Sequence, residues 1–255
     1  MAPIKPNIYI FPQLVDNYGY LIKNPHAKEA AIVDPSDLEI CERILDLNDC
    51  SLSHILLTHH HDDHIAAVED LKKKYGSKVI GYDLDKQLPS LDIAMKDNGE
   101  LSLYGNTYKI ISTPGHTMQH ICYYNIDFQM LFAGDTLFSL GCGRMFEGTP
   151  ELFWESLTKI KKLPTETKIY CGHEYTLNNF KFALSIDSKN QELKKYGEWI
   201  VKQNIDLRPT MPCELSKELK INPFLRCDDS YFFELYQSED PIEIFKKMRQ
   251  AKDNF

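Results

Sequence analysis

A cluster of four histidines and two aspartates at residues 59–64 restricts most strongly what this chain can fold into. The cluster follows the apolar run of residues 55–57 and precedes a helical pattern. In an extended segment, successive side chains point to opposite sides of the backbone. We therefore expect His59 and His61 to face one side and His60 the other.

Asp63 and His64 fall at the start of the following helix, where they can turn toward His59 and His61. Neutral imidazole and carboxylate groups suit zinc, iron or manganese. The four side chains exceed what one tetrahedral metal with an open position can use, so the cluster indicates two metal ions. A polar surface loop or a chance histidine run is the alternative, which the internal position after a strand disfavours.

Three further polar residues follow strand-like runs and lie beside glycines: His116, Asp135 and His173. Taken singly, each is typical of a turn or an exposed loop. In sheets flanked by helices, however, ligands gather at strand ends of this kind. Together with the histidine cluster, the three residues predict a single metal site built from distant segments.

Composition excludes several classes of function. With 29 basic and 37 acidic residues the net charge is −8, so we expect no nucleic-acid partner. The sequence has no run of 18 apolar residues, so we expect no membrane span. Prolines near its start disfavour a signal peptide. The seven cysteines form no C-x-x-C motif, which favours reduced thiols and a cytoplasmic location.

Strand-like and helical patterns alternate in the first two thirds of the chain, and helical patterns follow. This order predicts two packed units, divided into residues 1–173 and 174–255. The predicted strands are 7–13, 18–24, 29–35, 54–58, 78–83, 107–115, 120–126, 128–135 and 168–174, with a hairpin turn at 125–127. The predicted helices are 37–48, 64–75, 150–163, 188–204 and 241–252.

The motif T-H-x-H-x-D-H, followed by T-P-G-H-T, G-D-T and G-H-E, resembles the metallo-β-lactamase superfamily. More narrowly, the chain resembles glyoxalase II, the hydroxyacylglutathione hydrolase family. The segments after residue 134 make the resemblance specific, because they lie outside the shared ligand set. They are 134–138, 141–144, 146–149, 170–176, 222–226 and a tail with Arg249 and Lys252.

The resemblance implies an α/β fold, in which an αββα sandwich with two metal ions precedes a smaller helical substrate-binding domain. It also implies that Asp135 bridges the two ions. Zinc is the expected metal, with iron or manganese as alternatives. The implied ligands are His59, His61 and His116 for the first ion, and Asp63, His64 and His173 for the second.

The implied activity is hydrolysis of S-2-hydroxyacylglutathione, such as S-D-lactoylglutathione, to glutathione and D-lactate. This reaction is the second step of methylglyoxal detoxification. Two cations lower the pKa of a shared water from about 15.7 to about 7, which supplies a metal-bound hydroxide for attack on the thioester. A metal ion would stabilise the oxyanion. The thiolate departs without a general acid. We expect Asp63 and Asp135 to be the catalytic residues, with Asp63 orienting the attacking oxygen.

Glutathione is an anion, and so is this chain, so substrate binding requires a local basic patch. Residues 245–255 supply one, although composition alone would suggest a solvated helix end. The resemblance implies that Arg249 and Lys252 bind the glycine carboxylate of the substrate. The remaining implied contacts are Arg144 with the peptide portion, Tyr175 beside the ligand, and Phe146 where some relatives carry tyrosine.

Three alternatives share the metal-binding pattern. A persulfide dioxygenase would use a single iron ion, and it would lack the long helical C-terminal region. A lactonase or β-lactamase would share the hydrolytic chemistry. A metal-dependent binding module would hold ions without catalysis. The expected partner is a glutathione thioester, and the expected oligomeric state is a monomer.

Overall fold

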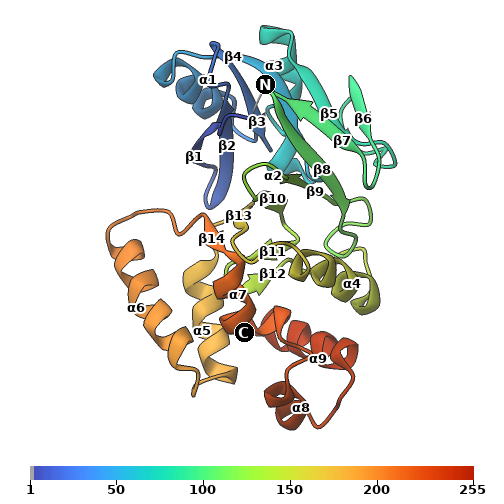
Figure 1. Ribbon diagram of the computed structural model, residues 1–255, viewed down its shortest axis with the longest axis vertical. Coiled ribbons are helices and arrows are strands. Elements are labelled where there is room, and N and C mark those ends of the chain that lie inside the picture. Colours follow the sequence, from blue (N-terminus) through green and yellow to red (C-terminus); the bar gives the residue numbers. More distant parts are fainter. Residues whose placement is uncertain (1–2) are drawn as a thin grey trace. The chain divides into compact units, whose positions relative to one another are not determined.

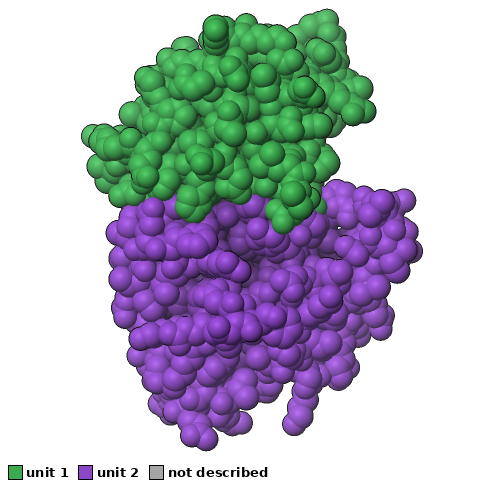
Figure 2. All heavy atoms as spheres, turned by 180° about the vertical axis from the view of Figure 1, so that it is seen from behind, with its two compact units in different colours: residues 1–112, 119–134 green, residues 113–118, 135–255 purple. Residues whose placement is uncertain are grey.

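The computed structural model describes residues 3–255, which form two compact units (Figure 1; Figure 2). Unit 1 comprises the described residues up to Ser112 together with Gln119–Gly134. Unit 2 comprises Thr113–Met118 and Asp135–Phe255. The chain therefore enters unit 2 briefly around residue 116 before it returns to unit 1. The division at residue 173 predicted from the sequence concerns domains rather than compact units, and it stays a prediction.

The first sheet of unit 1 combines an antiparallel and a parallel half (Figure 1). The first three strands pair antiparallel, and the following three pair parallel, which brings the carboxyl ends of β3 and β4 to one edge. The strands are β1 (Asn7–Gln13), β2 (Asn17–Lys23), β3 (Glu29–Val33), β4 (Ser51–Leu56), β5 (Lys78–Tyr82) and β6 (Ile93–Met95).

Two amphipathic helices cover one face of this sheet: α1 (Leu38–Leu47) and α3 (Val68–Tyr75). Their buried side chains pack with those of the strands in one apolar core. Burial of such side chains contributes about 1.5–3 kcal/mol each, which fixes the sheet edge that carries the site. Asp37 caps the first turn of α1 by accepting a hydrogen bond from Ile40 N at 3.0 Å.

The prediction of one continuous helix over residues 64–75 is wrong. A short helix, α2 (Asp62–Ile65), ends before α3 begins. The backbone N–H of Ala67 donates to Pro35 O at 3.2 Å instead of continuing the helical pattern. This tertiary hydrogen bond interrupts the ladder, and Gly76, with φ of 65°, ends α3 as predicted.

The second sheet of unit 1 contains an antiparallel series of β7 (Glu100–Leu103), β8 (Asn106–Ser112), β9 (Ile121–Asn125) and β10 (Met130–Gly134). The predicted hairpin turn is confirmed, and Asn125 Oδ1 accepts from Phe128 N at 2.8 Å. Tyr123 Oη donates to Leu57 O at 2.8 Å, which ties this sheet to the first one. Unit 1 is therefore a two-sheet structure whose buried strands read as nearly continuous apolar runs.

Unit 2 is mostly helical, as predicted for the region after residue 174 (Figure 1). The expectation that strands stop there is wrong, because Cys213 and Glu214 pair with Ile169 and Lys168 of an earlier strand. Three helices in this region were not predicted from the sequence: α5, α7 and α8. The elements are β11 (Leu137–Phe138), β12 (Gly141–Cys142), α4 (Pro150–Lys161), β13 (Lys168–Cys171), α5 (Thr176–Ile186), α6 (Gln191–Ile205), β14 (Cys213–Glu214), α7 (Leu215–Ile221), the 3₁₀ turn η1 (Pro223–Leu225), α8 (Ser230–Tyr236) and α9 (Pro241–Asp253).

Helices α4 and α9 begin and pack as their sequences suggest. Thr149 and Asp240 cap their first turns, each directly before a proline. The rings of Phe153 and Phe245 meet edge to face with centroids 5.6 Å apart. This contact fixes the C-terminal helix, which carries the basic residues of the predicted patch. In the described chain, no helix is both long and apolar enough to cross a bilayer.

Candidate metal centre

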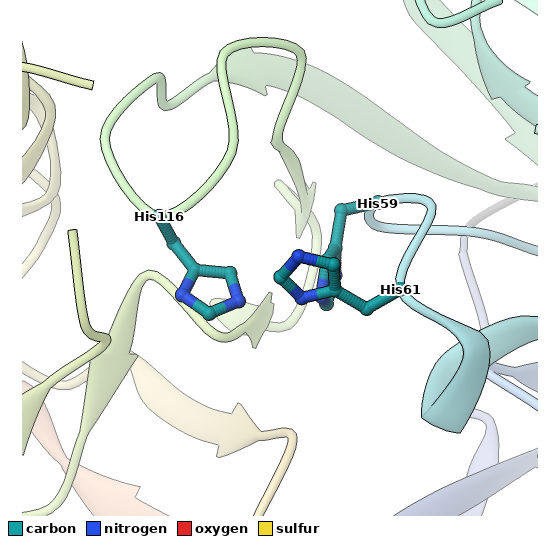
Figure 3. A group of neighbouring side chains, drawn as sticks. All are labelled: His59, His61 and His116. Atoms are coloured by element: carbon teal, nitrogen blue, oxygen red, sulfur yellow. The ribbon is translucent and has the colours of Figure 1, made fainter. Parts of the chain in front are cut away.

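The histidine cluster of unit 1 has the alternation that the sequence predicts. His59 and His61 lie on the segment after β4, with His59 Nε2 3.1 Å from His61 Nδ1 (Figure 3). His60 instead lies 2.9 Å from Asp85 Oδ2 through its Nδ1 atom. Two ring nitrogens at this separation must share either a proton or a cation. His59 and His61 therefore form one ready-made pair of nitrogen donors.

A buried aspartate that sequence reasoning missed orients this cluster. Asp34 Oδ1 accepts from Thr58 N at 2.9 Å, and Asp34 Oδ2 accepts from Thr58 Oγ1 at 2.7 Å. The same Oδ2 lies 3.0 Å from His64 Nδ1. A carboxylate at Nδ1 holds the proton there and leaves Nε2 as the lone-pair donor for a metal. Asp34 directly follows β3 and precedes Pro35, and its φ is 51°.

Asp63 is the predicted carboxylate ligand of the cluster, and 43% of its side chain is accessible. Asn17 Nδ2 donates to Asp63 Oδ2 at 2.9 Å, and Ser36 Oγ donates to the Asp63 carbonyl. Asp63 Oδ2 lies 3.7 Å from His64 Nε2, so both groups offer donors on the same side. Asn17, on the second strand, was also missed, and no motif in the sequence marks it.

Gly134 shows why the last strand of unit 1 ends in glycine. Its φ is 45°, and a Cβ there would lie 2.5 Å from Thr58 Oγ1 and 2.8 Å from His120 Nε2. His120 is buried and stacks on His59, with ring centroids 4.9 Å apart. Only glycine permits this close approach. His120 thus packs against a predicted metal ligand.

Unit 2 brings its three predicted ligands around one carboxylate oxygen. Asp135 Oδ2 lies 3.4 Å from His116 Nε2 and 3.3 Å from His173 Nε2. Each of the three residues is no more than 5% exposed. A buried carboxylate between two imidazoles is the arrangement expected of a ligand shared by two cations.

The ligands of unit 2 are held by backbone and ring contacts. His116 Nδ1 lies 2.8 Å from Arg144 O, which leaves its Nε2 as the metal donor. Gly143 is required beside them, because a Cβ there would lie 2.1 Å from Asp135 O. The His173 ring stacks on Tyr175 with an interplanar angle of 3°.

The chemistry of these donors fits metal ions. Within unit 1, Asp34, His59 and His64 each offer a ligand atom, all within 4.8 Å of one another. Imidazole nitrogens and carboxylate oxygens with no free thiolate among them suit Zn²⁺, Fe²⁺ or Mn²⁺. Of the seven predicted ligands, unit 1 carries His59, His61, Asp63 and His64, and unit 2 carries His116, Asp135 and His173.

The predicted substrate-binding residues all belong to unit 2. Arg144 and Phe146 are well exposed, and Tyr175 is about one third exposed. The Phe146 ring lies edge-on to the ring of His116, with centroids 5.3 Å apart. These side chains are therefore available to a substrate that approaches the predicted metal ligands of unit 2.

Arg249 and Lys252 differ sharply in their surroundings. Arg249 is 4% exposed and donates to Cys142 O at 2.9 Å, and its Nη2 lies 3.0 Å from Asp253 Oδ1. Its guanidinium therefore ties α9 to β12. Burial lowers the pKa of Lys252 to about 8, and the charges of Arg249 and Arg144 add to this effect.

Comparison with known proteins decides the family. The model of the metallo-beta-lactamase superfamily matches residues 15–173, and that of the hydroxyacylglutathione hydrolase C-terminus matches residues 174–255. A hydroxyacylglutathione hydrolase from Maricaulis maris is 40% identical over 96% of this chain and 97% of its own length. One from Pelagibacter ubique is 42% identical over 97% and 99% of the two chains.

The chain belongs to the hydroxyacylglutathione hydrolase family. Members of this family are thioester hydrolases, and the predicted α/β sandwich with a helical C-terminal region is confirmed. ETHE1 from Myxococcus xanthus has a similar crystal structure, with a TM-score of 0.68 and 22% identity over 96% of this chain and 90% of its own. The BLEG-1 B3 metallo-beta-lactamase has a TM-score of 0.65 and 23% identity over 86% of this chain and 99% of its own. At these identities the two structures show the fold alone.

Proposed function

We propose that this chain cleaves S-2-hydroxyacylglutathione thioesters, with S-D-lactoylglutathione as the main substrate. The products are glutathione and D-lactate, as in the second step of methylglyoxal detoxification. The observation that carries the proposal is the match of about 40% identity to relatives named hydroxyacylglutathione hydrolase over nearly the whole chain. The match includes the helical C-terminal region, which a persulfide dioxygenase was expected to lack.

The proposed centre uses the seven predicted ligands. His59, His61 and His116 would hold one ion, and Asp63, His64 and His173 would hold a second. Asp135 would serve both ions as a ligand, and its position between His116 and His173 supports this role. Two divalent cations, when bound, lower the pKa of a shared water and polarise a carbonyl oxygen.

The side chains of unit 1 orient the reactants. Asn17 Nδ2 occupies one side of Asp63 Oδ2, so the carboxylate is fixed in place while its exposed edge accepts a proton from the attacking water. Asp34 keeps the proton of His64 on Nδ1, which prevents His64 from competing as an acid. The leaving thiolate needs no general acid, because its conjugate thiol has a pKa of about 8.5.

The basic residues of unit 2 bind the glutathione part of the substrate. Arg144 supplies an exposed cation and Lys252 a half-buried one. Arg249 adds its positive charge from a buried position. Carboxylates of the substrate are the anions that match this patch. Tyr175 and Phe146 supply apolar contact beside the scissile bond.

Zinc is the proposed metal, because the imidazole and carboxylate donors suit it, with iron or manganese as the metals to compare. A cytoplasmic location is supported by the seven cysteines, all free and six of them buried. Burial raises the pKa of the Cys171 and Cys142 thiols, so neither is an activated nucleophile. We also propose that the protein acts as a monomer.

Hydrolysis of S-D-lactoylglutathione by purified protein tests the proposal, with zinc, iron and manganese measured on the same sample. We expect steady turnover and about two ions per chain. Complete removal of metal by a chelator should abolish turnover, and readdition should restore it. Oxygen uptake with glutathione persulfide, or lactone turnover without thioester turnover, would overturn the assignment in favour of a dioxygenase or a lactonase.

A further inference from the structure

A turn between two short strands of unit 2 has several polar groups that are bonded to side chains of the C-terminal region. It comprises residues 138–141 and joins β11 to β12. Leu140 has φ of 58°, a conformation that costs a non-glycine residue roughly 1–2 kcal/mol. Such a turn persists only where its surroundings hold it. The contacts that hold it come from α5, α7 and the residue after α7.

Glu218 of α7 is the central contact. Its Oε1 accepts from Ser139 Oγ at 2.7 Å, and its Oε2 accepts from Leu140 N at 2.8 Å. The side chain is fully buried, and burial raises the pKa of the Glu218 carboxyl while its hydrogen-bond donors act in the opposite direction. The Cys213 thiol is a further partner, which gives that buried cysteine a role.

Asn222 completes the support of the turn. Its Nδ2 atom donates to Phe138 O and Gly141 O, each at 3.1 Å, and to Glu218 Oε2 at 3.0 Å. Asn222 opens the segment Asn-Pro-Phe-Leu-Arg, which lies within the region that matches the hydroxyacylglutathione hydrolase C-terminus. From α5, Asn179 Nδ2 donates to Ser139 O at 3.1 Å.

The 138–141 turn also carries Phe138, whose ring contacts the predicted metal ligand His173. The Phe138 ring meets the His173 ring edge-on with centroids 6.0 Å apart, and meets Tyr175 at 5.2 Å. The His173 ring is thus packed between Phe138 on its edge and Tyr175 on its face. A histidine ring bound to a metal must keep its orientation within about 10–20°.

We propose that Glu218 and Asn222 are positioning residues, which hold the 138–141 turn so that Phe138 fixes the ring of His173 for metal binding. The inference rests on the proposed function only for the role of His173 as a ligand. It assigns the C-terminal helices a second task besides substrate binding: they set the geometry of one half of the metal centre. Neither residue touches the substrate or the reacting atoms.

Replacement of Glu218 tests the proposal, with zinc alone as the probe. We expect Glu218→Ala to bind the more weakly held Zn²⁺ about 10–100-fold less tightly in a chelator competition, as for other groups that orient metal ligands. The turnover number should fall, while KM should change little. Glu218→Gln should behave almost as wild type, because its amide oxygen can still accept from Leu140 and Asn222.

A double-mutant cycle tests whether Glu218 acts on His173 through the ring of Phe138. Phe138→Ala should weaken zinc binding as Glu218→Ala does, and the double variant should be no worse than either, because both act through the same ring. Phe232→Leu, in the core of α8, is the matched control. It should lower the melting temperature but keep both zinc ions. If Glu218→Ala fails to fold, Phe138→Leu and Asn222→Ala carry the same expectation.

Wild-type zinc affinity in folded Glu218→Ala, with only a lower melting temperature, would overturn the positioning role. Additive losses in the double variant would overturn the route through Phe138. Selective zinc loss in Glu218→Ala, in a protein whose wild type does not hydrolyse S-D-lactoylglutathione, would leave the positioning role intact and refute the proposed function instead.

Discussion

In unit 1 the predicted ligands lie within six consecutive residues, whereas in unit 2 they come from three separate turns around residues 116, 135 and 173. The ligands of unit 1 are oriented by a buried carboxylate, Asp34, which accepts hydrogen bonds from a neighbouring strand end. Those of unit 2 surround a carboxylate that is itself a predicted ligand, and ring packing holds them from outside.

The two arrangements differ in what a single substitution can remove. In unit 1, a supporting residue can change while all four predicted ligands stay in place. In unit 2, Asp135 is both a predicted ligand and the group that the other two predicted ligands face. Substitutions in unit 2 should therefore have the larger effects, and the following experiments test this order.

Asp135→Ala should have the largest effect. The variant lacks the carboxylate that faces both His116 and His173, so we expect it to lose metal and to lose more than about 100-fold in kcat/KM. Metal content and S-D-lactoylglutathione hydrolysis should be measured on the same sample. Near-normal turnover with a full metal complement would refute the role of Asp135 as a bridging ligand.

Asp34→Asn is the matched experiment in unit 1. The amide keeps the volume of Asp34 but cannot serve both Thr58 and His64 as a charged acceptor. We expect metal affinity or activity to fall about 10–100-fold, less than for Asp135→Ala. Titration of the metal-free protein with zinc measures the loss. An effect as large as that of Asp135→Ala would contradict the difference between the two units.

The difference between the two units also explains which site residues could be predicted from the sequence. The cluster at residues 59–64 was recognisable because its ligands are close in sequence and alternate along an extended segment. Asp34 and Asn17 were missed, because their roles depend on strand neighbours that come from distant segments. Nothing in the local pattern distinguishes Asp34 from an ordinary turn aspartate.

The fold was predictable to a similar degree. Strands with buried apolar runs and helices with capping residues, such as α4 with Thr149 and Pro150, lie close to their predicted positions. The break between α2 and α3 depends on the Ala67 N–H bonding to Pro35 O, which no periodicity reveals. The two-residue strand at Cys213 exists only because it pairs with β13.

Lys252→Gln separates substrate binding from the structural role of its neighbour. Arg249 is buried and bonded to Cys142 O, so its removal should lower stability as well as affinity. Lys252 is more accessible, and we expect Lys252→Gln to raise KM about tenfold with little change in kcat. A large fall in kcat at unchanged KM would show that Lys252 acts in catalysis instead.

The pH dependence of KM provides a smaller effect on the same residue. Because its pKa is lowered to about 8, Lys252 is charged below that pH and neutral above it. KM of the wild type should therefore rise several-fold as the pH increases through about 8. Steady-state kinetics of Lys252→Gln should lack this rise. The same rise in both proteins would exclude Lys252 as its source.

The smallest expected effects come from two helix caps, each of whose side chains accepts a hydrogen bond from its own helix. Asp37 caps α1 in unit 1, and Asp240 caps α9 in unit 2 by accepting from Ile242 N at 2.9 Å. Each alanine replacement should lower the free energy of unfolding by about 1 kcal/mol and leave kcat and metal content unchanged. Denaturant unfolding of the metal-loaded protein measures this change. If either variant lost metal, ligand geometry would depend on helix stability in general, and the distinction between a carboxylate-oriented unit 1 and a packing-oriented unit 2 would fail.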